Sequence, residues 1–186
     1  MAQEIKISTG NYKGFALKKI ISKEEIISKI ELMASDISNL YKNKNPLIVG
    51  VLNGSFIFMS DLIRLIKINY EIDFIKISSY GNNIKSSGKI ILNKDFSFDI
   101  KNRDVIIIED IIDSGRSLVF LKNYISDLGP RSLRFASLLY KKNTSIVDFE
   151  IDWIGFNIDD NFVVGYGLDL EQQFRGLNNI YRLIKE

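Results

Sequence analysis

Apolar residues follow two alternating patterns along the chain, and together these patterns predict an α/β fold. Short continuous apolar runs, such as 47–52 and 105–108, are typical of strands that are buried on both faces. Between these runs, apolar residues recur every three or four positions, as in helices with one buried face. The alternation favours a central, mainly parallel sheet flanked by helices. The expected helices are 22–40, 56–66 and 117–128, and the expected strands are 46–52, 70–79, 89–92, 105–108, 133–139, 153–156 and 162–165.

The chain shows no sign of division into separate domains. Its 186 residues contain no internal repeat and no Pro-, Gly- or Ser-rich stretch long enough to act as a linker. A chain of this length is typical of one domain. We therefore expect a single domain that spans residues 1–186.

Composition removes several kinds of chemistry from consideration. The chain has no Cys, which excludes disulfides, thiolate zinc sites and a Cys nucleophile. It also has no His, so any acid–base catalysis must use Asp, Glu, Lys, Arg, Tyr, Ser or Thr. A bound metal would then be a hard ion with oxygen ligands, such as Mg²⁺.

Charge and hydropathy narrow the expected surroundings of the protein. The chain has 25 Lys and Arg against 23 Asp and Glu, and this near balance gives no case for nucleic acid as a partner. No stretch approaches about 18 uncharged apolar residues, and the first residues lack the layout of a secretion signal. We therefore expect a cytoplasmic protein that binds neither nucleic acid nor a membrane.

The strongest candidate site directly follows the most apolar strand. Residues 105–108 are all aliphatic, and Glu109, Asp110 and Asp113 come next. The segment 114–117 then opens a helix, and the N–H groups and positive dipole end at a helix N-terminus attract phosphate. Paired carboxylates accept hydrogen bonds from the hydroxyls of a ribose. The segment therefore predicts a site for a phosphorylated sugar.

A capped helix is the simpler interpretation of the same segment. Asp113 or Ser114 would then accept from the first N–H groups of the helix, and the other acids would be solvated. The position of Glu109 and Asp110 at the carboxyl end of a buried strand favours the ligand site. The spacings of a Walker A loop and of the G-x-G-x-x-G motif are absent, so P-loop and Rossmann sites lose their support.

The segment 105–117 resembles the phosphoribosyl pyrophosphate (PRPP) signature of type I phosphoribosyltransferases. Other stretches are similar to the hypoxanthine-guanine phosphoribosyltransferase family, namely 50–56, 78–81, 148–156 and 162–169 with Phe174 and Arg175 just after. This resemblance runs from about Leu47 to Leu183. It implies a type I phosphoribosyltransferase-like fold with a core at about 45–145 and a small hood from about 1–20 and 148–186.

The resemblance also implies a reaction, in which a 5-phosphoribosyl group moves from PRPP to N9 of hypoxanthine or guanine and pyrophosphate is released. By resemblance, Glu109 and Asp110 hold the ribose hydroxyls, directly or around Mg²⁺, and Asp113 takes up the proton of purine N7. The 5′-phosphate would be held by four loop residues, Ser114, Gly115, Arg116 and Ser117.

Two other segments are implied to hold the pyrophosphate. One is the turn at Asn53 and Gly54, where relatives often have a cis peptide bond without proline. The other contains Arg175, which would contact pyrophosphate, and Asp169, which would hold a second Mg²⁺. Asn53 stands where relatives often carry Lys or Arg, so a positive charge is missing there. Arg116 stands where many relatives carry Lys or a neutral residue.

The resemblance assigns purine recognition to residues near the end of the chain. Lys141 would donate to the purine O6, which rejects the amino group of adenine. Phe162 would stack on the base, and the backbone of Val163 would meet its edge. The extra oxo group of xanthine would be recognised near Val163 and Asp169.

A polar loop at 79–88 is implied to close over the site as a lid, with Ser79 and Tyr80 reaching inward. Such a lid would keep water from an oxocarbenium-like intermediate. A hairpin tip without function explains the same composition.

Structural roles stay open for several of these residues when each is taken alone. Phe162 fits core packing, Lys141 fits a solvated pair with Lys142, Arg175 fits a surface ion pair, and Asn53 fits an ordinary turn.

Other functions also remain open at this point. A xanthine-preferring enzyme would share most of these residues, whereas Lys141 and Phe162 argue against an adenine phosphoribosyltransferase. A pyrimidine phosphoribosyltransferase is a further alternative. A non-catalytic regulator that keeps the PRPP fold and binds nucleic acid would need a basic face. By resemblance we also expect a homo-oligomer, either a dimer or a tetramer.

Overall fold

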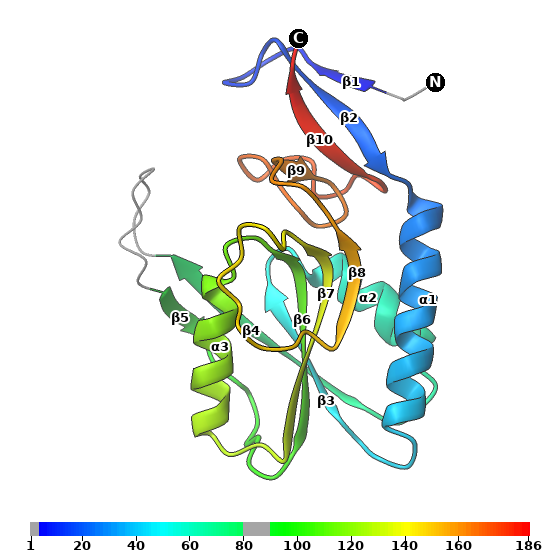
Figure 1. The fold of residues 1–186 in the computed structure, drawn as a ribbon, viewed down its shortest axis with the longest axis vertical. Coiled ribbons are helices and arrows are strands. Elements are labelled where there is room, and N and C mark those ends of the chain that lie inside the picture. The colour runs from blue at the N-terminus through cyan, green and yellow to red at the C-terminus, as the bar shows by residue number, and fades with distance from the viewer. Residues whose placement is uncertain (1–3, 80–89) are drawn as a thin grey trace.

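The structure is a computed structural model that describes residues 4–79 and 90–186. Its helices are α1 (Lys23–Leu40), α2 (Phe56–Leu65) and α3 (Arg116–Asp127). Its strands are β1 (Glu4–Ile7), β2 (Phe15–Ile21), β3 (Leu47–Leu52), β4 (Glu71–Ser79), β5 (Ile90–Lys94), β6 (Asp104–Ile112), β7 (Ser132–Tyr140), β8 (Trp153–Asn157), β9 (Val163–Val164) and β10 (Ile180–Lys185). They form a six-stranded core sheet, β5-β4-β3-β6-β7-β8, and a four-stranded sheet, β1-β2-β10-β9 (Figure 1).

The core sheet is parallel except for β5 at its edge, and helices cover both of its faces. Ile48 of β3 lies opposite Ile106 of β6, and both pack into the cluster that contains α1 and α2. Val49 and Ile107 are the next residues along these strands, and they pack with α3. Successive side chains of a strand point to opposite faces, so an unbroken apolar run is needed to fill both. The predicted central sheet is confirmed.

The start of α1 shows how the local sequence begins a helix. Before α1, Ser22 Oγ accepts from the Glu25 N–H at 3.3 Å, and Glu25 Oε2 accepts from the Ser22 N–H at 2.8 Å. Ser22 and Glu25 stand three residues apart in the sequence, the spacing of a capping box, which satisfies two otherwise free N–H groups. α3 begins at Arg116, one residue before the predicted start. In the described ranges, no helix has the length and apolar character needed to cross a membrane.

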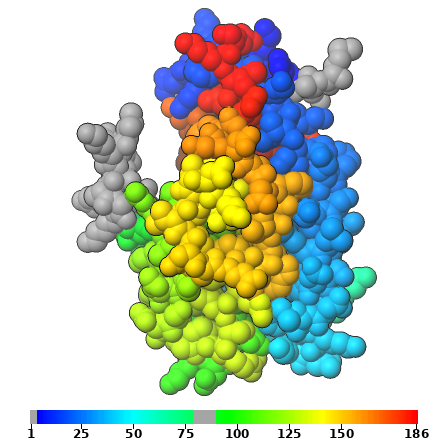
Figure 2. All heavy atoms as spheres, in the orientation of Figure 1, coloured from blue at the N-terminus to red at the C-terminus, as the bar shows by residue number. Residues whose placement is uncertain are grey.

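The four-stranded sheet joins the two ends of the chain and forms the hood. Leu17 of β2 lies opposite Leu183 of β10 in an antiparallel pair. In Figure 1 this hood lies beyond the carboxyl ends of the core strands, and Figure 2 shows both chain ends gathered at the same end of the molecule. The predicted hood range 148–186 includes β8. The structure places β8 in the core sheet instead, because it pairs in parallel with β7.

The predicted lid begins at the edge of the core sheet. β4 and β5 form an antiparallel pair there, with Ser79 opposite Ile90. Ser79 is the last residue of β4. Tyr80 and the rest of the loop to residue 89 lie outside the described residues, so the lid remains a prediction.

Candidate active site

Two neighbouring core strands end at the predicted site. Ile112 at the end of β6 lies opposite Tyr140 at the end of β7, so the residues that follow leave the sheet side by side. The N–H of Lys141 donates to the Ile112 carbonyl at 2.9 Å. Lys141 Nζ lies 3.1 Å from Asp113 Oδ2. The register of the sheet thus brings the predicted base and the predicted O6 donor together.

Glu109 and Asp110, near the end of β6, form a partly buried acid pair. Glu109 Oε2 is buried and has no hydrogen-bond partner among the described residues. Burial, with a contribution from the charge of Asp110, raises the pKa of Glu109 well above its ordinary range. Burial likewise raises the pKa of Asp110 to about 6. A buried acceptor without a partner, such as Glu109 Oε2, suits a ligand with hydroxyl groups or a cation, because such a ligand would satisfy it.

The loop between β6 and α3 leaves the N-terminus of α3 without a side-chain cap. The N-cap is Gly115, with φ 76°, and it offers no side-chain acceptor. The capped-helix interpretation, with Asp113 or Ser114 as the cap, is therefore wrong. A Cβ at Gly115 would lie 2.5 Å from Ser145 Oγ, so the loop packs tightly against the segment that follows β7. The helix keeps free N–H groups where an anion could bind.

A small hollow lies at this loop. Its volume is about 80 Å³, and it is lined by Glu109, Ile111, Ile112, Asp113, Ser114, Gly115, Ser117 and Leu118. Two of the predicted acids, Glu109 and Asp113, and the hydroxyl residues Ser114 and Ser117 therefore surround one space, whereas Asp110 does not line it.

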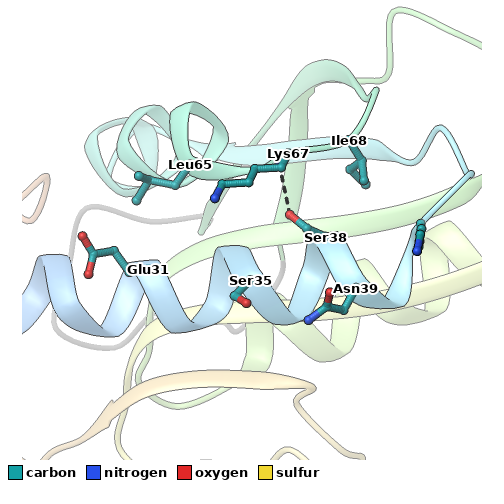
Figure 3. A pocket seen from close by; sticks show the side chains of 8 residues that line it. Glu31, Ser35, Ser38, Asn39, Leu65, Lys67 and Ile68 are labelled. Carbon is teal, nitrogen blue, oxygen red and sulfur yellow. Dashed lines mark hydrogen bonds between the residues drawn. The ribbon is translucent and has the colours of Figure 1, made fainter.

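A larger groove of about 580 Å³ lies elsewhere, between α1 and the segment that ends α2 (Figure 3). There the Lys67 N–H donates to Ser38 Oγ at 3.0 Å. Among the described residues, none that the sequence assigns to a site lines this groove. Its size alone therefore gives it no chemical role.

The turn after β3 packs against the acid pair. The Leu52–Asn53 peptide bond is cis, as the family resemblance implies. A Cβ at Gly54 would lie 1.7 Å from Asp110 Oδ2, so only a glycine fits between this turn and the carboxylate. A Cβ at Gly167 of the hood would lie 2.0 Å from the Gly54 carbonyl oxygen. The turn, the acid pair and the hood thus meet at Gly54.

Arg175 and Asp169 form an ion pair on the hood. The distance from Arg175 Nη2 to Asp169 Oδ1 is 2.7 Å, and Arg175 Nη1 donates to the Gly167 carbonyl at 2.7 Å. The side chains are only 20% and 26% exposed, so this is more than a surface pair. Burial and backbone hydrogen bonds have the largest effects on the pKa of Asp110. Smaller effects come from Arg175, which lowers this pKa, and from Asp169, which raises it. Both charges therefore act on Asp110.

The residues assigned to the purine differ in exposure. The Phe162 side chain is half exposed at 50%, so core packing does not explain it. Val163 is buried and begins β9. The Lys141 side chain is only 7% exposed, and a solvated pair with Lys142 is therefore the wrong interpretation. Phe162 and Lys141 remain suited to contact a ligand.

Comparison with known proteins places this site in a family. The sequence model of the phosphoribosyl transferase domain matches residues 17–171. The chain belongs to the phosphoribosyltransferase family. The hypoxanthine phosphoribosyltransferase of Buchnera aphidicola is 42% identical over 170 residues, which cover 90% of this chain and 96% of that protein.

Further relatives of this phosphoribosyltransferase differ in length. The bifunctional protein TilS/HprT of Listeria monocytogenes is 41% identical over 160 residues, but this chain spans only 25% of its length. A crystal structure of a hypoxanthine-guanine phosphoribosyltransferase from Bacillus anthracis aligns with a TM-score of 0.84 at 40% identity. The alignment covers 89% of this chain and 98% of that one. The predicted type I phosphoribosyltransferase fold is thereby confirmed.

Asp160 is a residue of this phosphoribosyltransferase site that the sequence did not indicate. It follows β8, the neighbour of β7 in the core sheet. Its Oδ1 lies 3.2 Å from Lys141 Nζ. No motif marks Asp160, and its role depends on the pairing of strands that are distant in sequence. Asp160 could have been assigned to the site only if the order of β6, β7 and β8 in the sheet had been known.

Proposed function

We propose that this protein is a hypoxanthine-guanine phosphoribosyltransferase of purine salvage. It transfers the 5-phosphoribosyl group of PRPP to N9 of hypoxanthine or guanine, which gives IMP or GMP and pyrophosphate. The observation that carries the proposal is the uncapped N-terminus of α3 directly beside the strand-end acids of β6. Relatives with about 40% identity bear the name of this enzyme.

In this proposal the loop before α3 holds the phosphate end of the substrate. The backbone N–H groups of 115–117 and the hydroxyls of Ser114 and Ser117 donate to the 5′-phosphate oxygens. Glu109 and Asp110 accept from the ribose hydroxyls. Their carboxylates also stabilise positive charge that develops on the ribose as the bond to pyrophosphate breaks.

The purine is held on the opposite side of the ribose. Lys141 donates to O6, and Phe162 stacks on the ring. As N9 bonds to C1′, pyrophosphate leaves with the electron pair of the broken bond, and the N7 proton passes to Asp113. Arg175 and the turn at Asn53 and Gly54 hold the pyrophosphate.

We also propose that Mg²⁺ acts in the reaction, because the acids fit such an ion. Glu109 Oε2 is a buried oxygen in need of a partner. Across 4–79 and 90–186, no three acidic side chains form a ready metal cluster, so substrate oxygens would supply most ligands. Glu109 and Asp110 would hold one ion and Asp169 a second. When bound, Mg²⁺ neutralises the charge of the leaving pyrophosphate.

The substrates PRPP and a 6-oxopurine are the small-molecule partners in this proposal, and the protein forms a dimer or a tetramer. Sedimentation of the purified protein measures that state. A monomer would remove the oligomer from the proposal and leave the chemistry in place.

Pyrophosphate release from PRPP and Mg²⁺ tests the proposed reaction, with hypoxanthine, guanine, xanthine and adenine supplied one at a time. Turnover is expected with hypoxanthine and guanine and not with adenine. Asp113→Asn should lower kcat by about 100- to 10,000-fold, since a general base contributes this much. Asp159→Asn is the matched control, because Asp159 is exposed and its carboxylate forms no hydrogen bond or ion pair with the described residues. Absence of turnover with all four bases would overturn the proposed function.

A further inference from the structure

Three consecutive strands of the core sheet deliver three charged residues to one place. Tyr140 lies opposite both Ile112 and Asn157, so β6, β7 and β8 end in register. The backbone continues this alignment, because the Ile158 N–H donates to the Tyr140 carbonyl at 3.0 Å. Asp113, Lys141 and Asp160 follow these three strand ends. The sheet itself therefore sets their spacing.

Lys141 is the buried member of this group. Its side chain is 7% exposed, whereas those of Asp113 and Asp160 are 58% and 66% exposed. A buried ammonium is costly unless its donors are paired. Its Nζ lies 3.1 Å from Asp113 Oδ2 and 3.2 Å from Asp160 Oδ1. An ammonium has three N–H donors, and these two contacts use two of them. In the described part of the chain, the third donor has no partner.

We infer that Asp160 is a positioning residue for Lys141, which fixes the ammonium so that its third N–H is available to an oxo group of the purine. This inference rests on the proposed function. With two donors held by the carboxylates of Asp113 and Asp160, the third donor is directed away from both of them. A donor that is oriented before the base arrives loses less freedom on binding.

Asp160 also protects the role proposed for Asp113. Without Asp160, the ammonium would pair with Asp113 alone and would hold the oxygens that must accept the N7 proton. With Asp160 present, the ammonium is shared between two carboxylates. Asp160 therefore acts through Lys141 and needs no contact with substrate.

Steady-state kinetics of Asp160→Ala and Asp160→Asn test this inference. The KM for hypoxanthine should rise about 3- to 10-fold in Asp160→Ala, because a less well oriented ammonium loses only part of the roughly 10- to 150-fold that a hydrogen bond to a charged group contributes. Asp160→Asn keeps an acceptor oxygen and should show a smaller rise. The KM for PRPP should not change, because the phosphate loop and the acid pair are untouched. Asp159→Asn, the adjacent exposed carboxylate, should match the wild type in both constants.

The results separate this inference from the proposed function. A wild type that turns over hypoxanthine, with an unchanged base KM in Asp160→Ala, would overturn the inference alone. Equal rises in both KM values would also overturn it, since they indicate general loosening of the fold. A wild type without turnover would overturn both.

Discussion

The acid pair of β6 and the lysine after β7 lie at the same edge of one sheet, yet their electrostatics are opposite. Glu109 and Asp110 are partly buried acids with raised pKa values, and one buried oxygen of Glu109 lacks any partner in the described structure. Lys141 is a buried cation, but two exposed carboxylates hold it. The acid pair is thus incomplete until a ligand arrives, whereas the lysine is already oriented. The difference is consistent with the proposed function, in which the acid pair receives the sugar and Lys141 selects the base.

The largest loss should come from disturbing the acid pair through Gly54. In Gly54→Ala the new methyl group would lie 1.7 Å from Asp110 Oδ2, so the turn or the carboxylate must move. A displacement of about 1 Å at a reacting site costs about 100-fold, and we expect kcat/KM for PRPP to fall at least that far. Gly176→Ala is the control, since nothing lies within 4 Å of a Cβ there. Equal activity of the two variants would contradict the packing described here.

Removal of the charge on Lys141 should have the next largest effect, confined to the base. Lys141→Met keeps a chain of similar length but cannot donate to O6, so the KM for guanine should rise about 30-fold, within the range for a charged hydrogen bond. The KM for PRPP should stay constant. Lys142→Met, at the exposed neighbour, should leave both constants unchanged. A rise in the KM for PRPP alone would show that the two halves are wrongly assigned.

The smallest predicted effect is on the stability of the fold. Most substitutions destabilise a protein, but removing one acid of the acid pair should stabilise it. The pKa of each acid is raised, so the folded protein binds protons that the unfolded chain releases from about pH 4 upward. The free energy of unfolding therefore falls as pH rises through the window from about 4 to 6 for Asp110, and further for Glu109. In ligand-free protein with EDTA, Glu109→Gln should stabilise the fold at pH 8 by about 1–2 kcal/mol.

Thermal unfolding at two pH values checks this stability prediction. The Tm of Glu109→Gln should exceed that of the wild type by about 2–8 °C at pH 8. At pH 5 the gain should shrink, because Glu109 is already protonated. Glu150→Gln, at an exposed acid without described side-chain contacts, should show no gain at either pH. A lower Tm for Glu109→Gln at pH 8 would contradict the picture of an unsatisfied acid.

Much of the core could be predicted because its information is local. The apolar runs at 47–52 and 105–108 fill both faces of a sheet, and the capping box at Ser22 and Glu25 starts α1. The hood could not be predicted in the same way. β2 and β10 lie at opposite ends of the chain, and only their pairing in space, such as Leu17 with Leu183, makes them strands. Short strands with mixed polar residues carry little signal of their own.

The candidate site likewise has a part that is local in sequence and can be predicted, and a part that depends on the order of the strands. Asp113 and its loop stand next to each other in sequence, so a motif can show them. The contact between Asp160 and Lys141 depends on the order of β7 and β8 in the sheet. The approach of Gly54 to Asp110 likewise depends on the pairing of β3 with β6. Such contacts arise from sheet order, which composition and spacing do not encode.

A crystal structure of the protein with GMP tests the central claim most directly. The account predicts the phosphate against the N–H groups that open α3, the ribose hydroxyls on Glu109 and Asp110, and the guanine O6 on Lys141. GMP bound elsewhere, with the loop between β6 and α3 empty, would contradict it.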